Sequence, residues 1–224
     1  MRLDHRPAVA IQRREKMRAR LIEAAVLVVA GKGLENTVID DIVAQAGVSR
    51  GTFYNHFAAV PDLMLAAQEE LSNEILVDVE AAVRVIPKPD QRLAHGIFLF
   101  MATASAFPLL GHFVKELGNI GIAEASKIHA LLPEHLAEGI ASGDFCPVSV
   151  SVVSDFLASS VSATLLRECN GEDVDAPGIV AALLRGLGVE RARAEELSKL
   201  RVAPLVLRPD SLVARSNAIW LSSR

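Results

Sequence analysis

The sequence predicts an all-α protein made of a small N-terminal helix-turn-helix head and a larger helical body. Apolar residues recur at helical spacing through most of the first 190 residues, in segments separated by Gly, Pro, Ser or Thr. Two short predicted helices flank a tight glycine turn at Gly47. One stretch, Val148 to Ser154, alternates like a strand, but the uncharged run of helical length that follows favours a helix there too.

The head is expected to contain three helices. The first runs from Gln12 to Ala30 and ends at the glycines that follow, the last of them Gly33. A short second helix begins at Thr37 and ends at Gly47, where the turn allows a positive φ. Ser49 then caps a third helix that reaches Phe57.

The body follows from Pro61, which suits a first helical turn. Its first helix is expected to reach about Ile86, and further helices are expected over 91–106, 108–117, 119–142, 148–169 and 176–188. The predicted domains are therefore a head at 10–60, a body at 61–190 and a C-terminal extension at 191–224. For this extension an accessory helix, a dimer arm and a disordered tail all remain open.

Charge is distributed unevenly along the chain, whose net charge is −4. Residues 1–60 hold nine Lys/Arg and six Asp/Glu, or +3, whereas residues 61–224 hold fourteen and twenty-one, or −7. Seven of the basic residues lie within the first twenty positions. A basic end on an otherwise acidic chain indicates a local binding site for a polyanion.

The composition indicates a cytoplasmic protein with no membrane span. The longest uncharged run, Leu93 to Val114, has 22 residues, but polar residues, Gly and Pro interrupt it, which favours a broken helix pair. No apolar segment with a cleavage site follows the basic N-terminus. Cys146 and Cys169 are expected to be reduced thiols, because a helical segment between them would hold them too far apart to bridge.

Several kinds of enzyme site have no motif in this sequence. It contains no GxSxG, P-loop or GxGxxG, and no Cys/His cluster with zinc spacing. His129 and His135 are six residues apart, which places them on opposite faces of a helix. We therefore expect no cofactor, no metal and no catalytic activity.

The segment "RREKMRARLIEAAVLVVAGKGLENTVIDDIVAQAGVSRGTFYNHF" resembles the DNA-binding domain of the TetR family of transcriptional regulators. The resemblance is clear over about residues 10–65, and "DIVAQAGVSRGTFYNHF" is its most specific part. It implies an all-α homodimer with a helix-turn-helix head that binds double-stranded DNA. It also implies a larger body that binds a small-molecule effector.

The third helix is the expected reader of the major groove. Arg50 could bind guanine and Thr52 a base or a thymine methyl, while Tyr54 and His56 resemble the family's pair of backbone contacts. Phe53 and Phe57 are expected in the core of the head. The full set expected at DNA is Thr37, Ser49, Arg50, Gly51, Thr52, Tyr54, Asn55, His56, Arg13 and Arg14.

The sequence departs from the family pattern just after the third helix, in "AAVPDL". Ala59 stands where a small polar cap is usual, and Ala is a poor N-cap. Val60 stands where the family commonly has a Lys that meets the DNA backbone. One phosphate contact is therefore expected to be missing, which lowers the salt dependence of binding.

The aliphatic body suits an apolar pocket with a few polar groups. The residues expected to touch a ligand are His95, Phe98, Met101, Thr103, Ser105, His112, Phe113 and His129, with Asn119 as a further polar candidate. The resemblance places the dimer interface on the last two body helices. Its expected residues are Val153, Leu157, Val161, Leu165, Ile179, Leu183 and Leu187, against the alternative of ordinary core packing.

These observations favour a dimeric repressor that binds a palindromic operator and is released by a small, largely apolar effector. Ligand binding is expected to shift the helix that begins at Pro61 and so to change the separation of the two heads. Three alternatives remain: an activator of the same family, a helix-turn-helix protein that acts only through protein partners, and an enzyme that uses a body histidine.

Overall fold

The computed structural model describes residues 6–117 and 127–223, and within these ranges all regular structure is helical. The all-α prediction is confirmed. The head contains α1 (Arg6–Lys32), α2 (Ile39–Ala46) and α3 (Arg50–Tyr54). The body contains α4 (Val60–Val83), α5 (Pro89–Ser105), α6 (Pro108–Leu117), α7 (Ile128–Ser142), α8 (Val150–Cys169) and α9 (Ala176–Gly186). Two more helices follow, α10 (Arg191–Leu197) and α11 (Leu212–Ser222).

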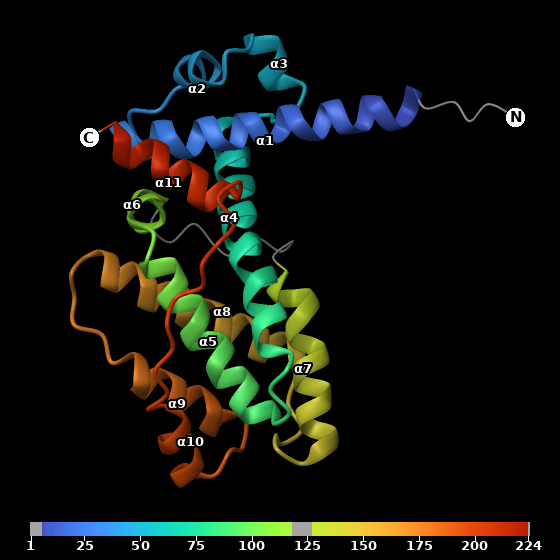
Figure 1. Cartoon of the computed structure of the whole chain (residues 1–224), viewed down its shortest axis with the longest axis vertical. Coiled ribbons are helices and arrows are strands. Elements are labelled where there is room, and N and C mark those ends of the chain that lie inside the picture. The colour runs from blue at the N-terminus through green and yellow to red at the C-terminus, as the bar shows by residue number, and fades with distance from the viewer. Residues whose placement is uncertain (1–5, 118–126, 224) are drawn as a thin grey trace, which may run out of the picture.

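In the head, α2 and α3 lie on one side of the long helix α1 (Figure 1). Leu21 and Ile22 of α1, Ile42 of α2 and Phe53 of α3 are fully buried between them. The turn between α2 and α3 depends on Gly47, whose φ of 62° is in the left-handed region that favours glycine. This apolar core fixes the direction in which α3 faces.

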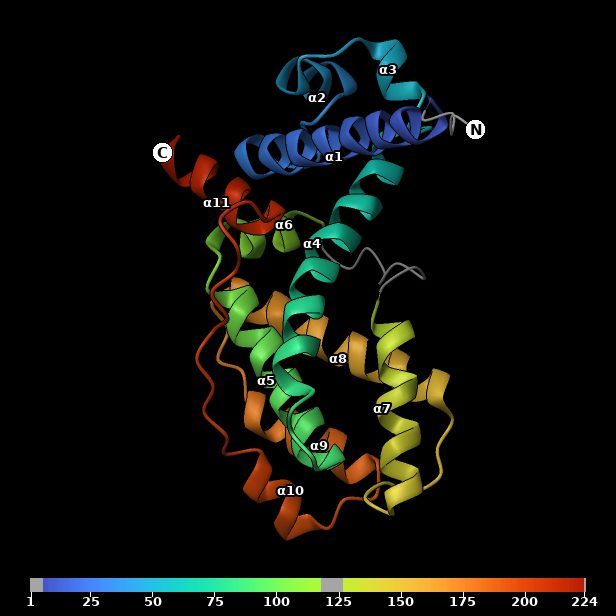
Figure 2. The same cartoon turned by 45° about the vertical axis from the view of Figure 1, so that its right-hand side comes forward.

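One continuous helix, α4, joins the head to the body. It starts beneath α1 and descends along the body, as both views show (Figures 1 and 2). Leu63 and Met64 near its start are fully buried, and so is Ile75 three turns later. A displacement of its lower part is therefore transmitted along a single rigid element.

The uncharged run in the body forms a bent pair of helices, as the interrupted pattern predicted. α5 and α6 meet at an angle of 92°. Among the described helices α8 alone is long and apolar enough to span a bilayer, and α5 with α6 passes the same test only as one bent span. Core helices of globular proteins meet these criteria as well, so they are weak support for a membrane span.

Two expectations for the body concern helix boundaries. The strand-like stretch at Val148 leads into α8, so the helical assignment is confirmed there. The helix expected over 119–142 corresponds to α7, which begins at Ile128. The predicted start of that helix and Asn119 lie outside the described residues.

The C-terminal residues form a strap, which we define as residues 198–223. The strap begins directly after α10. An ion pair between Arg193 of α10 and Asp90 (2.8 Å) holds α10 against the start of α5. The strap then runs up the body, where the backbone N–H of Leu205 donates to Thr103 Oγ1 (3.0 Å). It ends in α11, which contacts α1, α4 and α6.

Helix α11 is fixed to both parts of the molecule by polar contacts. The Glu74 carboxylate of α4 accepts hydrogen bonds from the first backbone N–H groups of α11 (2.7 and 2.8 Å), where the helix dipole favours negative charge. On the head side, Arg215 pairs with Glu23 (2.7 Å), and the Trp220 indole donates to the Ala30 carbonyl (3.3 Å). An accessory helix therefore occupies this part of the chain.

Candidate DNA-binding face and body cavity

Helix α3 is short, and its two ends are held in different ways. At its start, the Ser49 hydroxyl accepts a hydrogen bond from the Thr52 backbone N–H (3.2 Å), as predicted for an N-cap. At its end, Phe53 and Phe57 are buried, and the Tyr54 ring packs edge-on against Phe53 with centroids 5.5 Å apart. The helix is thus anchored by its aromatic side.

The opposite side of α3 faces solvent. Arg50, Gly51, Tyr54 and Asn55 are exposed, and Thr52 and His56 are partly exposed. Together with the exposed Ser49 they form one continuous polar surface, which we call the reading face. Most of the residues expected at DNA from the third helix therefore lie together and are accessible.

Arg50, the expected base reader, is held by a carboxylate in the free protein. Its Nε and Nη2 both donate to Asp40 of α2, in a two-pronged ion pair. The hydrogen bond from Arg50 holds the pKa of Asp40 below its usual value. Both side chains remain largely exposed, at 63% and 61%, so water and ions have access to the pair.

The prediction for Thr37 is wrong. This residue is buried, and its hydroxyl donates to the Gly33 carbonyl (2.7 Å) rather than facing a phosphate. The chain turns at Gly33 (φ 83°) and brings Thr37 back to the carbonyls left at the end of α1. α2 consequently begins at Ile39, and the Asp41 carboxylate accepts from the Val38 backbone N–H (2.9 Å).

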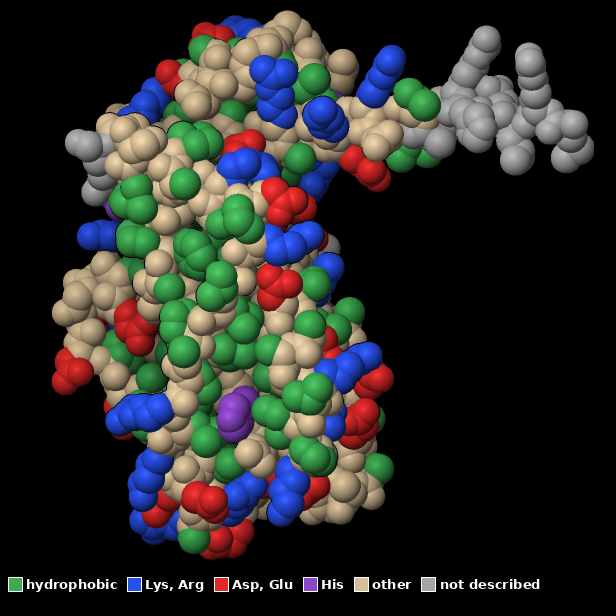
Figure 3. Space-filling view, in the orientation of Figure 1, with side chains coloured by type: hydrophobic (Ala, Val, Ile, Leu, Met, Phe, Trp, Pro, Cys, Tyr) green, Lys and Arg blue, Asp and Glu red, His purple; other side chains and the backbone are tan. Residues whose placement is uncertain are grey.

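Basic side chains of α1 extend this surface. Arg13 and Arg14 are exposed. Burial, together with the charges of Arg14 and Arg18, lowers the pKa of His56 below its usual value, which favours the neutral imidazole. In the view of Figure 3, Lys and Arg side chains project from the head among some acidic ones, and the body also shows both signs of charge.

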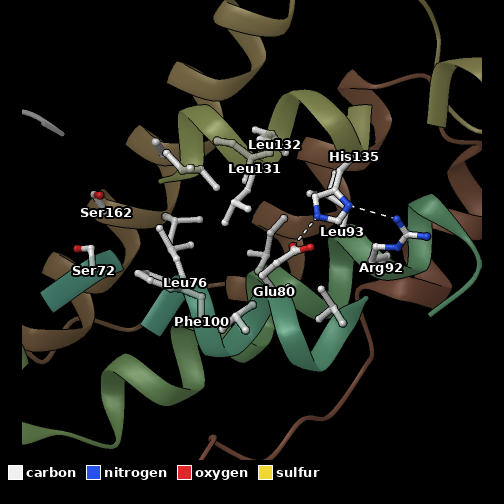
Figure 4. A pocket seen from close by; sticks show the side chains of 18 of the residues that line it. Ser72, Leu76, Glu80, Arg92, Leu93, Phe100, Leu131, Leu132, His135 and Ser162 are labelled. Atoms are coloured by element: carbon white, nitrogen blue, oxygen red, sulfur yellow. Dashed lines mark hydrogen bonds and ion pairs between the residues drawn. The ribbon is translucent and has the colours of Figure 1, made fainter. Parts of the chain in front are cut away.

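The body contains a cavity of about 140 Å³ between α4, α5, α7 and α8. Its wall is mostly aliphatic, with polar side chains gathered at two ends (Figure 4). Ser72 and Ser162 lie at one end, and Glu80, Arg92 and His135 lie at the other (Figure 4). The labelled apolar residues are Leu76, Leu93, Phe100, Leu131 and Leu132.

The polar cluster at the second end is an internal hydrogen-bond network. His135 Nε2 lies 2.6 Å from Glu80 Oε2, and its Nδ1 lies 3.3 Å from Arg92 Nη1. Because Arg92 can only donate, Nδ1 accepts and Nε2 carries the proton of a neutral imidazole. Burial opposes the charge on Glu80, but hydrogen bonds from His135 and Arg84 and the positive charge of Arg84 hold its pKa below the ordinary value.

None of the eight residues predicted to touch a ligand lines this cavity. Phe113, Met101 and Thr103 are in the core, since they lie on faces of α5 and α6 that pack against other helices. His95 bonds the Gln91 carbonyl, Ser105 donates to Glu168 (3.0 Å), and the His112 ring lies 5.7 Å from that of Trp220. Phe98 and His129 are partly exposed elsewhere.

Sequence reasoning missed the residues that form the polar ends. One usable signal was Glu80, which shares an otherwise apolar face of α4 with Leu76, Val79 and Val83. A carboxylate on such a face needs a partner. Its partners come from α5 and α7, which no spacing within α4 could reveal.

The residues predicted at the dimer interface differ in how deeply they are buried within the single chain. Most are buried within the single chain, namely Leu157, Val161, Leu165, Leu183 and Leu187, so core packing accounts for them. Val153 and Ile179 are partly exposed. The large apolar side chains that α8 does expose are Val152 (64%) and Phe156 (58%).

The described residues hold no group of three or more His, Cys, Asp or Glu side chains suited to a metal ion. Both cysteines are free thiols.

A trihelical head with an exposed, polar third helix beside a basic first helix defines a helix-turn-helix DNA-binding protein.

Comparison with known proteins finds a similarity over the head. Residues 21–67 match the bacterial regulatory proteins of the tetR family. The uncharacterized HTH-type transcriptional regulator YvdT of Bacillus subtilis (strain 168) is 36% identical over 61 residues, which are 27% of this chain and 31% of that protein. The chain thus matches about a third of the length of this relative. Over its head, the chain is therefore similar to the TetR family of transcriptional regulators.

Solved structures share the fold over most of the chain. RolR in complex with its ligand resorcinol has a TM-score of 0.65 at 24% identity, covering 88% of this chain and 99% of that one. A putative TetR-family regulator from Syntrophomonas wolfei has a TM-score of 0.61 at 18% identity, covering 84% and 97%. The chain therefore shares the fold of these structures, in both head and body.

Proposed function

We propose that this protein is a cytoplasmic, ligand-responsive repressor that binds a palindromic operator as a homodimer and leaves it when a small molecule enters the body cavity. The continuity of α4 is the observation that carries the proposal. Its first turns are buried in the head at Leu63 and Met64, and its residues from Gln68 to Val83 line the cavity. A ligand that moves this wall also moves the head.

In the DNA complex, Arg50 leaves Asp40 and binds a base edge, with guanine O6 and N7 as the matching acceptors. Tyr54, Asn55 and the neutral His56 donate to phosphates or bases. Arg13 and Arg14 supply attraction that does not depend on sequence. Thr37 has no part in this complex, because its hydroxyl is already bonded inside the head.

The proposed dimer forms through the outer face of α8, with Ile179 of α9 at its edge. Val152 and Phe156 are exposed there, and the small residues Ser159 and Ala163 continue the same face. Small residues let two helices approach closely, while Phe156 supplies a large apolar anchor. A two-fold dimer presents two α3 helices to a two-fold operator.

The test is operator binding by the full chain. DNA sites bound in cells are mapped, and affinity for the recovered site is measured by gel shift beside a scrambled site. We expect a Kd of about 10⁻⁸ M or tighter on the recovered site and a loss of at least a thousandfold on the scrambled one. Equal affinity for the two DNAs would contradict the proposal.

The dimer is tested separately by sedimentation velocity. Phe156→Asp should convert a dimer into a folded monomer that no longer binds the full operator. Val85→Asp, at a residue that is 81% exposed and lies beyond the end of α4, is the matched control and should stay dimeric. A monomeric wild-type protein would exclude this interface.

A further inference from the structure

The cavity contains one polar atom whose hydrogen-bonding capacity is not used. Gln68 Oε1 is buried in the cavity wall and has no hydrogen-bond partner among the described residues. Leaving a buried acceptor unpaired costs free energy, so such atoms are rare in folded proteins. A ligand that donates a hydrogen bond at this position would remove that cost.

The charged groups at the other end of the cavity are already satisfied. Arg92 Nε donates to the Ile86 carbonyl (2.9 Å), Nη2 lies 3.5 Å from the Pro87 carbonyl, and Nη1 serves Glu138 and His135. The network therefore offers no free cation to a ligand carboxylate or phosphate.

The carboxylate of this network, Glu80, also has its hydrogen-bond partners within the protein. Glu80 accepts from Arg84 (3.2 Å) and from His135 (2.6 Å). An ammonium group would have to displace one of these partners. A charged group of either sign at this end of the cavity would thus be buried without a free counter-ion, which is strongly unfavourable.

The size of the cavity sets a further limit. Its 140 Å³ is close to the roughly 150 Å³ of an apolar cavity known to bind benzene. A single ring with one or two substituents fills this space. Long acyl chains and nucleotide-bearing molecules exceed it.

We propose that the effector is an uncharged, single-ring molecule with a hydroxyl group that donates a hydrogen bond to Gln68 Oε1. This inference rests on the proposed function, because it names the ligand class of the same cavity. The ring occupies the aliphatic middle, and Ser72 lies one helical turn from Gln68 to accept or donate a second hydrogen bond. Gln68 also lies one turn from Met64, which is buried in the head, so the bond forms at the end of the cavity where α4 meets the head.

Calorimetry on the full-length protein tests this with four matched probes: phenol, toluene, benzoate and benzylamine. Phenol should bind at least about tenfold more tightly than toluene, which corresponds to one net hydrogen bond to a buried acceptor. Benzoate and benzylamine should show no binding at the same concentrations. Toluene binding as tightly as phenol, preferred binding of a charged probe, or no binding of phenol would each overturn the inference.

A variant assigns the effect to one atom. Gln68→Met keeps the length of the side chain and removes the acceptor, so it should lower phenol affinity about tenfold and leave toluene affinity equal or higher. Gln45→Met, at an exposed position of α2, is the control and should change neither. Loss of both ligands in Gln68→Met would contradict the assigned bond. The wild-type comparison of phenol with toluene is independent of how this variant folds.

Failure of this inference can be told apart from failure of the proposed function. Operator binding in the absence of ligand tests the regulator alone. If the operator is bound but phenol has no effect in either assay, the ligand class is wrong and the regulator stands. If phenol binds as expected but no operator is found, the function is wrong and the cavity assignment stands.

Discussion

The head and the body use ion pairs in different surroundings. In the head, Arg50 and Asp40 are paired while both remain more than half exposed. In the body, Arg193 and Asp90 are paired with side-chain exposures of 27% and 7%. Exposed pairs contribute little to stability and exchange readily, whereas a buried pair cannot lose one partner without leaving an unpaired charge. The Arg50–Asp40 pair can therefore be exchanged for contacts with DNA, whereas the Arg193–Asp90 pair is a fixed part of the body.

This difference suits the two binding events. In the proposed DNA complex, Arg50 exchanges its carboxylate partner for DNA, which carries many negative charges. In the free protein, the ion pair with Asp40 holds the Arg50 side chain in place. In the proposed ligand site the charge network is already closed, so we expect hydrogen bonding to Gln68 and shape to decide what binds. Substitutions in the two regions should accordingly affect different measurements.

The largest effect is expected from breaking the body pair. Asp90→Ala leaves Arg193 without its main partner and removes the bond to the Gln91 backbone N–H (2.6 Å). We expect the free energy of unfolding to fall by about 3 kcal/mol, measured by urea denaturation. Arg191→Ala on the same helix breaks only an exposed pair with Glu195 and serves as the control. Equal losses in the two variants would remove the distinction between fixed and exchangeable pairs.

Acid should weaken the body through the same carboxylates. Burial opposes the charge of Asp90, but hydrogen bonds from Arg193 and the Gln91 backbone hold its pKa below the usual value, and the pKa of Glu80 is lowered as well. Their contribution to stability is therefore present above about pH 4 and is lost as the pH falls through the folded-state values. Denaturation midpoints between pH 7 and pH 3 measure this. Asp90→Asn should flatten the profile, and an unchanged profile would contradict it.

In the head, Arg50→Ala should lower operator affinity about tenfold or more and relax preference at one base pair. Its thermal stability should stay near that of the wild type, because the pair with Asp40 is exposed. Tyr54→Phe should weaken all operators alike. Affinities for a set of operators with single base changes separate these outcomes, and equal losses on every operator for Arg50→Ala would refute its role as a base reader.

A better N-cap for α4, at the junction between the head and the body, should stabilise the protein. Ala59 precedes α4 and offers no side-chain acceptor, although the Asp62 carboxylate accepts from its backbone N–H (3.0 Å). Ala59→Ser adds the missing cap and should raise the free energy of unfolding by about 1 kcal/mol. Ala58→Ser, one residue earlier, is the control for the added hydroxyl. A stability gain of the same size at both positions would show that capping is not the cause.

The smallest effect is expected from Asp40→Asn. It frees Arg50 and removes a negative charge near DNA, so operator affinity should rise about two- to threefold at low salt and less at high salt. Glu172→Gln breaks a similar exposed pair with Arg167 in the body and should leave DNA affinity unchanged. An unchanged or lower affinity for Asp40→Asn would mean that Asp40 positions Arg50 rather than competing for it.

The head was predictable because its structure is local in sequence. The glycine turn at Gly47, the cap at Ser49 and the inward rings of Phe53 and Phe57 all follow from spacings of a few residues. Thr37 was misplaced because two helix ends compete for its hydroxyl. Its hydroxyl donates to the Gly33 carbonyl at the end of α1, and the preference of Thr for helix starts does not reveal this contact.

The cavity and the strap were not predictable because distant residues build them. His135 meets Glu80 across 55 positions, and Leu205 meets Thr103 across 102. Helical periodicity identifies the inward face of each helix, but it does not say where four inward faces leave space unfilled. It also cannot assign the stretch before α11, whose Leu205 backbone N–H donates to Thr103 of α5.

The strap has a consequence for the order in which the protein is made. Trp220 covers the underside of α1 at Ala30, and Arg215 pairs with Glu23, so the first helix of the chain is completed by the last. While the ribosome is still adding residues, the apolar underside of the head lacks this cover. The packing of α1 is therefore completed only once α11 has been made and has folded against it.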